Sequence, residues 1–197
     1  LHLRQEVSCI VCRGQDGATA TFPVAENEHR HGILAVSIVP ARVLPEVERQ
    51  ARALATRIAQ ALDYVGVLCV EFFVLDDGRL VVNEIAPRPH NSGHYSIDAC
   101  VTSQFEQQAR VMAGLPLGDT TQAMPSVLLY ILGDAWYDGE RQREPDWSSV
   151  VAVPGAKPQS VWGRSSVQLH RLPRWKPVSQ STCRSWPTRR RASTAPR

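Results

Sequence analysis

Lysine is missing from residues 1–146, and acidic side chains are missing from residues 147–197 of this 197-residue chain. The net charge of +3 therefore hides an acidic first part and a strongly basic second part. Such a split is compatible with an acidic domain that carries a basic, nucleic-acid-binding arm. The hydrophobic share of 43% permits a packed core and excludes a wholly disordered chain.

Long apolar runs, a secretion signal and an initiator methionine are also missing. The most apolar stretch, residues 65–75, is far shorter than the roughly 18 residues of a membrane span, and it contains Glu71. The first residues show no signal-peptide pattern, and because they lack Met we expect the chain to begin inside a longer protein. The absence of GxxxxGK[ST] excludes a P-loop protein. We expect a cytoplasmic protein without membrane association.

The five cysteines are an odd number in a chain without secretory features, which favours reduced thiols. Cys9 and Cys12 form a CxxC pair. A zinc or redox site of this type needs a second ligand pair or a strand–helix junction. The pair lies inside VSCIVCRG, which is typical of a strand, so we interpret both as buried strand residues.

Periodicity and turn signals predict a mixture of strands and helices. Residues 6–26 predict a β-hairpin around the turn residues 15–17, and residues 26–41 predict a turn followed by an apolar strand. Apolar spacing predicts a helix over 44–63, and Ser103 with Glu106 could cap a helix that runs to about Ala113. Apolar runs predict strands over 65–75, 79–86 and 125–133.

The hairpin over residues 70–86 places two glutamates opposite each other. Asp77-Gly78 suits a two-residue turn. Counting outward from this turn predicts the facing pairs Asp76–Arg79, Leu75–Leu80, Phe73–Val82 and Glu71–Glu84. The two carboxylates would then share an otherwise apolar face, where like charges destabilise the sheet unless something neutralises them.

Three interpretations of Glu71 and Glu84 are open. The register could be shifted by one, or both side chains could reach solvent at the end of the sheet. The two carboxylates could share a proton. The third interpretation is a divalent cation, with Mg²⁺ first, because Mg²⁺ favours one or two protein carboxylates completed by water and phosphate oxygens.

The stretch that follows, NEIAPRPHNSGH (residues 83–94), contains many charged and hydrogen-bonding side chains. Arg88 lies four residues beyond Glu84 and could bind a phosphate or a carboxylate through two hydrogen bonds. His90 and His94 could serve a site or could be ordinary hydrogen-bonded loop histidines. Two histidines beside two hard carboxylates argue against zinc.

These residues resemble the ATP-grasp core of the N5-carboxyaminoimidazole ribonucleotide synthase family. The resemblance rests on VEFFV, on VVNEIAPRPHNSGHYSIDACVTSQFEQ and, earlier, on EVSCIVCRGQDG and ENEHRHGIL. It covers roughly residues 5–157. It implies an α+β chain with part of an ATP-grasp fold, in which antiparallel sheets pack against helices, followed by an irregular basic tail.

The resemblance implies a ligase that uses ATP, Mg²⁺ and bicarbonate to carboxylate aminoimidazole ribonucleotide in purine biosynthesis. Glu71 and Glu84 would hold Mg²⁺ between the ATP phosphates. The residues implied to contact the nucleotide are Glu6, His29, Asn83 and Glu84. The residues implied to face bicarbonate, carboxyphosphate and the ribonucleotide are Arg88, His90 and Asn91. A homodimer is implied for the intact enzyme.

The resemblance also implies a domain division. Residues 1–40 would be the remainder of the small ATP-grasp subdomain, 41–134 the large subdomain with the metal and ATP site, and 135–157 the start of the C-terminal domain. Residues 158–197 hold three of the five tryptophans, no acid and no sustained period. We interpret this stretch as an atypical basic tail, produced by a shifted reading frame that begins near Lys157.

Other functions remain compatible with the sequence. The chain could belong to another ATP-grasp carboxylate or bicarbonate ligase. It could be a non-catalytic module whose basic tail binds nucleic acid, although this is the less favoured interpretation, or a decayed gene product. Because the resemblance covers only part of the family's length, an isolated chain would expose sheet surface and tend to aggregate.

Overall fold

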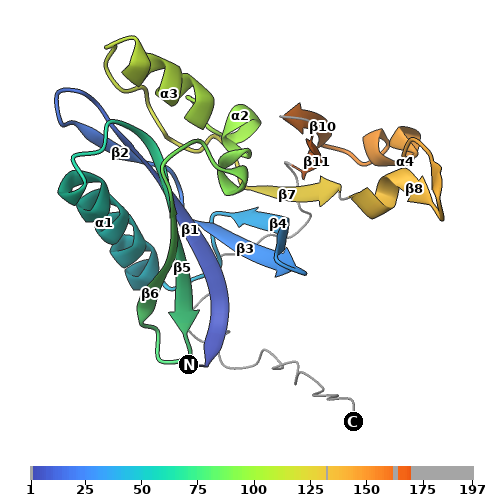
Figure 1. Cartoon of the computed structure of the whole chain (residues 1–197), viewed down its shortest axis with the longest axis horizontal. Coiled ribbons are helices and arrows are strands. Elements are labelled where there is room, and N and C mark those ends of the chain that lie inside the picture. The colour runs from blue at the N-terminus through green and yellow to red at the C-terminus, as the bar shows by residue number, and fades with distance from the viewer. Residues whose placement is uncertain (1, 132, 162–163, 170–197) are drawn as a thin grey trace.

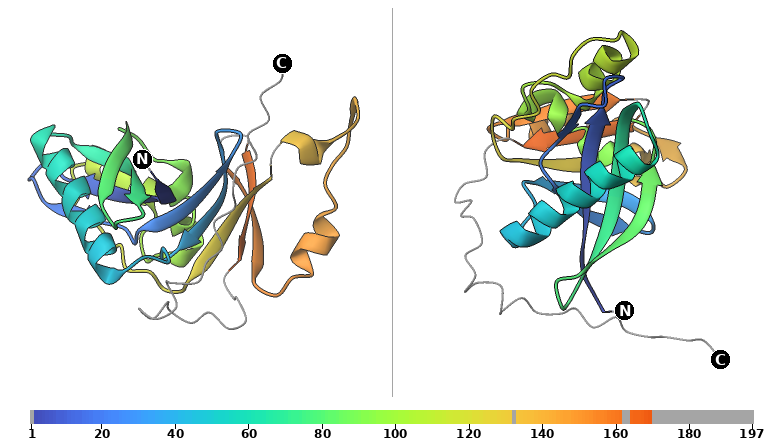
Figure 2. Two further views of the ribbon diagram at one scale, coloured as in Figure 1. Left: turned by 90° about the horizontal axis from the view of Figure 1, so that it is seen from below. Right: turned by 90° about the vertical axis from the view of Figure 1, so that its left-hand side faces the viewer.

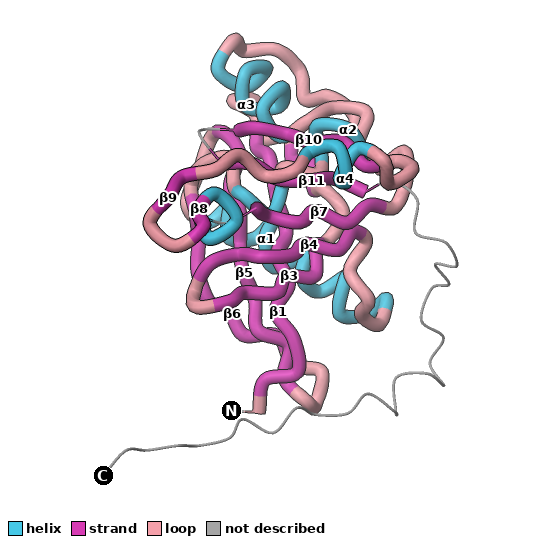
Figure 3. Tube along the Cα trace, turned by 90° about the vertical axis from the view of Figure 1, so that its right-hand side faces the viewer, coloured by secondary structure: helices cyan, strands magenta, loops and turns pink. Residues whose placement is uncertain are grey.

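A single nine-stranded sheet dominates the computed structural model, which describes residues 2–131, 133–161 and 164–169 (Figure 1). The strands are β1 (Leu3–Arg13), β2 (Thr19–Thr21), β3 (Ala25–Arg30), β4 (Ile33–Val39), β5 (Gly66–Leu75), β6 (Leu80–Ala86), β7 (Ser126–Ile131), β10 (Ala156–Val161) and β11 (Arg164–Leu169). Their order is β10-β11-β7-β4-β3-β1-β5-β6, with β2 paired to β1. Every pairing in this sheet is antiparallel, and Figure 3 shows β7, β4 and β3 stacked in this order.

One face of the sheet is covered by α1 (Pro45–Ala61), which confirms the helix predicted over residues 44–63. Pro45 suits the first turn, where its missing N–H has no intrahelical partner. The helix lies across the strands of the sheet (Figure 2). Its buried residues pack against β1 and β5. This cluster contains Val47, Ala51, Ala55 and Ala59 from α1, Val7, Cys9 and Val11 from β1, and Leu68, Val70, Phe72 and Val74 from β5.

The other face of β1 and β5 is covered by the segment that follows β6. This segment contains a 3₁₀ turn, η1 (Asn91–Gly93), and two helices, α2 (Ser96–Ala99) and α3 (Gln104–Met112). Tyr95 is completely buried here, and its hydroxyl donates to the carbonyl of Pro23 at 2.7 Å. Ile10, Cys12 and Cys69 belong to the same cluster. Because side chains alternate along a strand, Glu71 faces this second side of the sheet.

Two local predictions need correction near the start of the chain. The second arm of the predicted hairpin is interrupted at residues 22–24, so β2 and β3 pair with β1 in different registers. Residues 26–30, expected to be a turn, lie in β3, and the turn instead sits at His31 and Gly32, both with positive φ. Polar residues form this strand because Asn27 and His29 face partners on neighbouring strands.

Cys9 and Cys12 are confirmed as buried residues of β1, and they are free thiols, as are Cys69 and Cys100. Burial raises the pKa of both Cys9 and Cys12 to about 12. The predicted cap at Ser103 is also confirmed, since its hydroxyl accepts a hydrogen bond from the backbone N–H three residues later, at 3.1 Å.

The first part of the stretch predicted as an irregular tail contains strands. Residues 158–161 lie in β10 and residues 164–169 in β11, which pairs with β7. Ser166, Val167 and Gln168 are all buried, and the Gln168 amide donates to the carbonyl of Tyr95 at 2.9 Å. With consecutive residues buried on both faces, β11 shows no simple alternation, which is why the pattern was missed. Residues 170–197 lie outside the described residues.

Between β7 and β10 lie only short elements. They are η2 (Gly133–Trp136), β8 (Tyr137–Asp138), β9 (Arg141–Gln142) and α4 (Trp147–Val151). The main sheet draws strands from both sides of residue 40, and the division into subdomains stays a prediction. None of the helices in the described residues combines the length and apolar character that crossing a membrane requires.

Candidate metal and nucleotide site

Glu71 and Glu84 lie directly opposite each other on β5 and β6, as the sequence predicts. The length of the hairpin loop and the register next to it differ from the prediction. The hairpin loop has three residues rather than two, because the N–H of Leu75 donates to the carbonyl of Arg79 at 2.9 Å. Gly78 has φ of 84°, a conformation that glycine adopts without strain.

A β-bulge at Asn83 cancels the effect of the longer loop. Next to the loop the register is displaced by one residue, and it shifts back between Phe72 and Glu71. Leu80 therefore packs on the α1 side of the sheet instead of sharing the face of Glu71. Two errors thus offset each other at the carboxylate pair. The predicted pairs that are wrong are Asp76–Arg79, Leu75–Leu80 and Phe73–Val82.

The two carboxylates differ in their surroundings. The Glu71 side chain is only 13% exposed, whereas Glu84 is exposed. Burial raises the pKa of the Glu71 carboxyl, nearby His29 opposes the rise, and the negative charges of Glu84 and Glu6 add to it. The pair therefore has unfavourable electrostatics that a cation between the carboxylates would relieve.

Glu6 and His29 lie beside this pair. The His29 imidazole Nδ1 contacts the Glu6 carboxylate across β1 and β3, and both side chains are partly exposed. β1 pairs with β5 so that Ser8 faces Glu71 and Glu6 faces the next residue on the same side, Phe73. Glu6 and His29, which were predicted to contact the nucleotide, thus lie on the same face of the sheet as the two facing carboxylates.

His90 reaches the same face from the loop after β6. Its Nε2 lies 3.6 Å from Oε1 of Glu71, and its Nδ1 lies 2.9 Å from the hydroxyl of Ser92. Burial lowers the pKa of His90 to about 4, and the charge of Arg88 adds to this effect. The imidazole is therefore neutral near pH 7, and its contact with Glu71 is not an ion pair at that pH.

The other predicted residues occupy the rim of the site. Arg88 is exposed, and its guanidinium donates to the carbonyl of Pro89 at 3.0 Å. Asn83 is exposed at the bulge. Asn91 opens η1, and its backbone carbonyl accepts from the hydroxyl of Tyr130. Arg88 and Asn83 are thus accessible to a ligand, whereas the backbone of Asn91 anchors the loop.

Gln104 is a residue of this region that the sequence reasoning missed. Its side-chain oxygen accepts from the N–H of His90 at 2.9 Å, and its amide donates to the His90 carbonyl at 2.7 Å. Gly93 packs against it so closely that an added Cβ would meet the Gln104 oxygen at 2.6 Å. The available signal was a helix N-terminus that follows the histidine loop, with a glutamine at its first position.

The donor set fits Mg²⁺ rather than a softer metal. Glu71 and Glu84 supply carboxylate oxygens, the ligands that hard cations prefer. Among the residues that the structure describes, no group of three or more His, Cys, Asp or Glu side chains is arranged to hold a metal by itself. A two-carboxylate site suits Mg²⁺ that is completed by water and phosphate oxygens.

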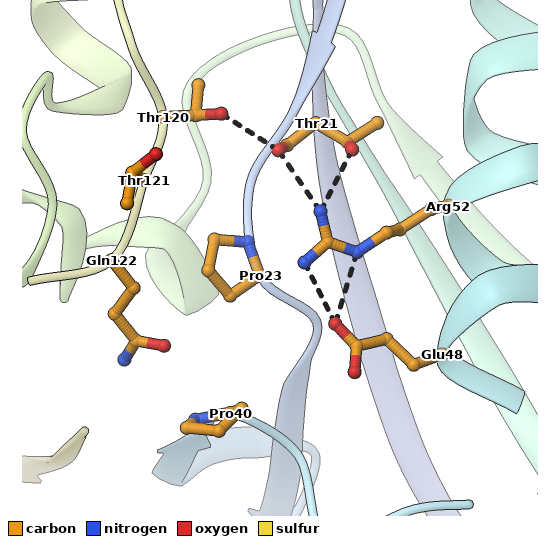
Figure 4. A pocket seen from close by; sticks show the side chains of 8 residues that line it. All are labelled: Thr21, Pro23, Pro40, Glu48, Arg52, Thr120, Thr121 and Gln122. Atoms are coloured by element: carbon orange, nitrogen blue, oxygen red, sulfur yellow. Dashed lines mark hydrogen bonds and ion pairs between the residues drawn. The ribbon is translucent and has the colours of Figure 1, made fainter. Parts of the chain in front are cut away.

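A separate hollow of about 340 Å³ lies between α1 and the segment 120–122 (Figure 4). Arg52 crosses it, donating to the carboxylate of Glu48 at 2.8 Å and to the hydroxyl of Thr21 at 3.2 Å. Thr120 donates to the carbonyl of Thr21 at 3.0 Å. None of the predicted site residues lines this hollow, and its polar groups largely satisfy one another.

Comparison with known proteins assigns the family. The ATP-grasp domain profile matches residues 1–105, which is more than half of the chain. This chain belongs to the ATP-grasp family. The carboxylate pair, Glu6 and His29 all lie inside the matched range.

Several relatives of this ATP-grasp chain are N5-carboxyaminoimidazole ribonucleotide synthases. The N5-carboxyaminoimidazole ribonucleotide synthase of Bacillus subtilis is 52% identical over 131 residues, covering 66% of this chain and 34% of the relative. A crystal structure of an ADP complex of N5-carboxyaminoimidazole ribonucleotide synthetase has a TM-score of 0.77 and 40% identity, covering 87% of this chain and 46% of that one. The Aspergillus clavatus synthase, in complex with ADP and 5-aminoimidazole ribonucleotide, has a TM-score of 0.75 and 27% identity, covering 86% of this chain and 47% of that one.

This ATP-grasp chain therefore spans between a third and a half of the length of these proteins. A match to 87% of the chain also has to include residues beyond Lys157. The strands β10 and β11 lie in this stretch. The shift of reading frame near Lys157 stays a prediction.

Proposed function

We propose that this chain supplies the metal-binding and phosphate-facing part of an N5-carboxyaminoimidazole ribonucleotide synthase. The observation that carries the proposal is the facing pair Glu71 and Glu84, placed beside His90 on a fold shared with solved synthases. One of these synthases binds ADP and 5-aminoimidazole ribonucleotide. The proposed reaction joins bicarbonate to the 5-amino group of that ribonucleotide and converts ATP to ADP and phosphate.

In this proposal Glu71 and Glu84 hold Mg²⁺ against the ATP phosphates. When bound, the ion neutralises charge on the phosphoryl group that is transferred to bicarbonate to form carboxyphosphate. Glu6, His29 and Asn83 contact the nucleotide from the neighbouring strands. The position of Glu71 between β1 and β6 supports this arrangement, because all three side chains lie on strands adjacent to it or one strand further.

Arg88, His90 and Asn91 face the bicarbonate side of the site. The exposed guanidinium of Arg88 is free of acidic partners in the described residues and suits a bidentate contact to a carboxylate or phosphate. His90 is buried next to Glu71 and neutral near pH 7, so it acts there as a hydrogen-bonding group rather than a charge. A homodimer and a cytoplasmic location stay predictions for the complete enzyme.

The test is a chimera with a complete relative. Residues 1–157 replace the matching segment of the Bacillus subtilis synthase, and ADP release is measured with and without aminoimidazole ribonucleotide and bicarbonate. We expect activity that needs both substrates and Mg²⁺, and we expect Glu84→Gln to lower it by about a hundredfold. The matched control Glu28→Gln, on an exposed carboxylate of β3, should leave activity unchanged.

Two outcomes would favour the alternatives. ADP release that ignores aminoimidazole ribonucleotide would indicate another ATP-grasp ligase. Binding of the unmodified chain to DNA or RNA that is steeply salt-dependent and survives Glu84→Gln would indicate a nucleic-acid-binding module.

A further inference from the structure

A row of buried polar side chains leads from the middle of the sheet to His90. It crosses β4, β3 and β1 and ends in the loop after β6. Ser37 lies 2.9 Å from Asn27, Asn27 lies 2.9 Å from Ser8, Ser8 lies 2.8 Å from Ser92, and Ser92 lies 2.9 Å from His90 Nδ1. These contacts join residues that are up to 84 positions apart in the sequence.

Burial makes these contacts obligatory. Ser37 and Ser92 are fully buried, and Ser8 and Asn27 are 1% and 6% exposed. An unsatisfied buried polar group costs about 1–3 kcal/mol, so every member of such a row needs a hydrogen-bond partner. The Ser92 hydroxyl has one further contact, 3.8 Å from the Cys69 thiol, which is longer than its contacts within the row. The row therefore has few alternative arrangements, and its geometry at His90 is fixed by the strands.

The direction of the hydrogen bonds follows from one group that can only donate. The backbone N–H of Ser92 points to His90 Nδ1 at 3.3 Å, so Nδ1 carries a lone pair and not a proton. The Ser92 hydroxyl must then donate to Nδ1 as well, and it accepts from Ser8. Ser8 in turn accepts from the amide of Asn27, whose oxygen accepts from Ser37. All donors in the row point toward the histidine.

This direction determines what His90 presents to the site. With Nδ1 occupied as an acceptor, the neutral ring carries its proton on Nε2. Nε2 is the atom that lies 3.6 Å from the Glu71 carboxylate. That distance is longer than a hydrogen bond, so the N–H remains available to an oxygen atom bound at the carboxylate pair.

We propose that Ser92, Ser8 and Asn27 are positioning residues, which hold His90 in the tautomer whose Nε2–H points into the site at Glu71. The proposal rests on the proposed function for the nature of the ligand, which is an anionic oxygen such as that of a phosphate or a carboxylate. The tautomer itself is a property of the chain alone.

The tautomer is measured by NMR on the ¹⁵N-histidine-labelled chain at pH 7.5 without added metal or nucleotide. Long-range ¹H–¹⁵N spectra distinguish Nε2–H from Nδ1–H, and His90→Gln identifies the His90 signal. We expect a single Nε2–H form in the unmodified chain. Ser92→Ala should shift the signal toward a mixture of tautomers, because it removes the hydroxyl donor at 2.9 Å and leaves Nδ1 with only the longer, 3.3 Å contact to the backbone N–H. Ser8→Ala should act in the same direction, because the Ser92 hydroxyl then loses the donor that orients it.

Ser126→Ala is the matched control. Ser126 is also a buried strand serine, but its hydroxyl has no hydrogen-bond partner among the residues that the structure describes, so its removal should leave the His90 signal unchanged. A His90 that carries its proton on Nδ1, or two tautomers in the unmodified chain, would overturn the proposal even if the variants failed to fold. Unchanged His90 spectra in folded Ser92→Ala and Ser8→Ala chains would overturn it too.

Mn²⁺ binding, followed by calorimetry, separates this inference from the proposed function. We expect the unmodified chain to bind Mn²⁺ and Glu84→Gln to weaken this binding by at least about tenfold, because it removes one of the two carboxylates. An Nε2–H form in a chain that does not bind Mn²⁺ would support the positioning row and contradict the metal site. Mn²⁺ binding by a chain with mixed tautomers would contradict the positioning row and support the metal site.

Discussion

Replacing Glu71 by glutamine should stabilise the metal-free chain while weakening its binding of divalent cations. Facing side chains on an antiparallel pair have Cβ atoms about 4.5–5.5 Å apart. For carboxylates separated by roughly 6 Å, Coulomb's law with an effective dielectric constant near 20 gives about 3 kcal/mol of repulsion. Glu84 is exposed, so solvent screening reduces this to about 1 kcal/mol. Glu71→Gln also weakens the attraction between Glu71 and His29, and the gain of about 1 kcal/mol already includes this loss.

Urea unfolding of Glu71→Gln and of the unmodified chain, both with a chelator, measures this gain. A gain of about 1 kcal/mol corresponds to a rise of roughly 2–4 °C in Tm for a chain of this size. Because the folded-state pKa of Glu71 is raised, the carboxyl costs no stability below its unfolded-state pKa, and the cost grows as the pH rises through the folded-state pKa. The advantage of Glu71→Gln should therefore be present at pH 7 and vanish below the ordinary carboxyl pKa.

The gain in stability of Glu71→Gln should be accompanied by weaker metal binding. Mn²⁺ affinity of Glu71→Gln should fall by at least about tenfold. Glu28→Gln, which alters an exposed carboxylate on β3, should change neither quantity. A Glu71→Gln chain that is less stable at pH 7 and binds Mn²⁺ as tightly as the unmodified chain would refute the account of a strained carboxylate pair.

Further predictions concern the core, a helix cap and the thiols. Phe72→Ala should lower the free energy of unfolding by about 3–5 kcal/mol, because the ring is completely buried against α1. Val82→Ala, at an exposed residue of β6, should cost less than about 1 kcal/mol, and urea titrations compare the two variants. Ser103→Ala should cost about 1 kcal/mol through loss of the N-cap of α3, and an unchanged urea midpoint would contradict the cap. Because burial keeps Cys9 and Cys12 protonated, both should react with a thiol reagent at pH 8 only after unfolding; mass mapping that finds either labelled in the native chain would contradict their burial.

Local periodicity was sufficient to predict much of the fold. The helix α1 has a strong apolar stripe and a proline at its start, and β5 and β6 are apolar runs around an Asp-Gly turn. Strands that contain many polar residues were harder to predict. Residues 26–30 of β3 looked like a turn because Asn27 and His29 bond to partners on other strands, and such long-range contacts leave no periodic signal.

The facing pair of glutamates was predicted correctly for a reason that was partly wrong. Counting from a two-residue turn reached the pair Glu71–Glu84, but the real path uses a three-residue loop and a bulge at Asn83. Loop length and bulges depend on backbone conformations that residue types only bias. The polar row from Ser37 to Ser92 could not be predicted, since it depends on which strands become neighbours.

The most direct test of the central claim is a Mn²⁺ titration of the ¹⁵N-labelled chain, followed by paramagnetic broadening of its amide signals. The account predicts that broadening begins at Glu71, Glu84 and the loop around His90, spares the hollow beside Arg52, and disappears in Glu84→Gln. Broadening that starts elsewhere, or that Glu84→Gln leaves unchanged, would contradict a metal site at the facing carboxylates.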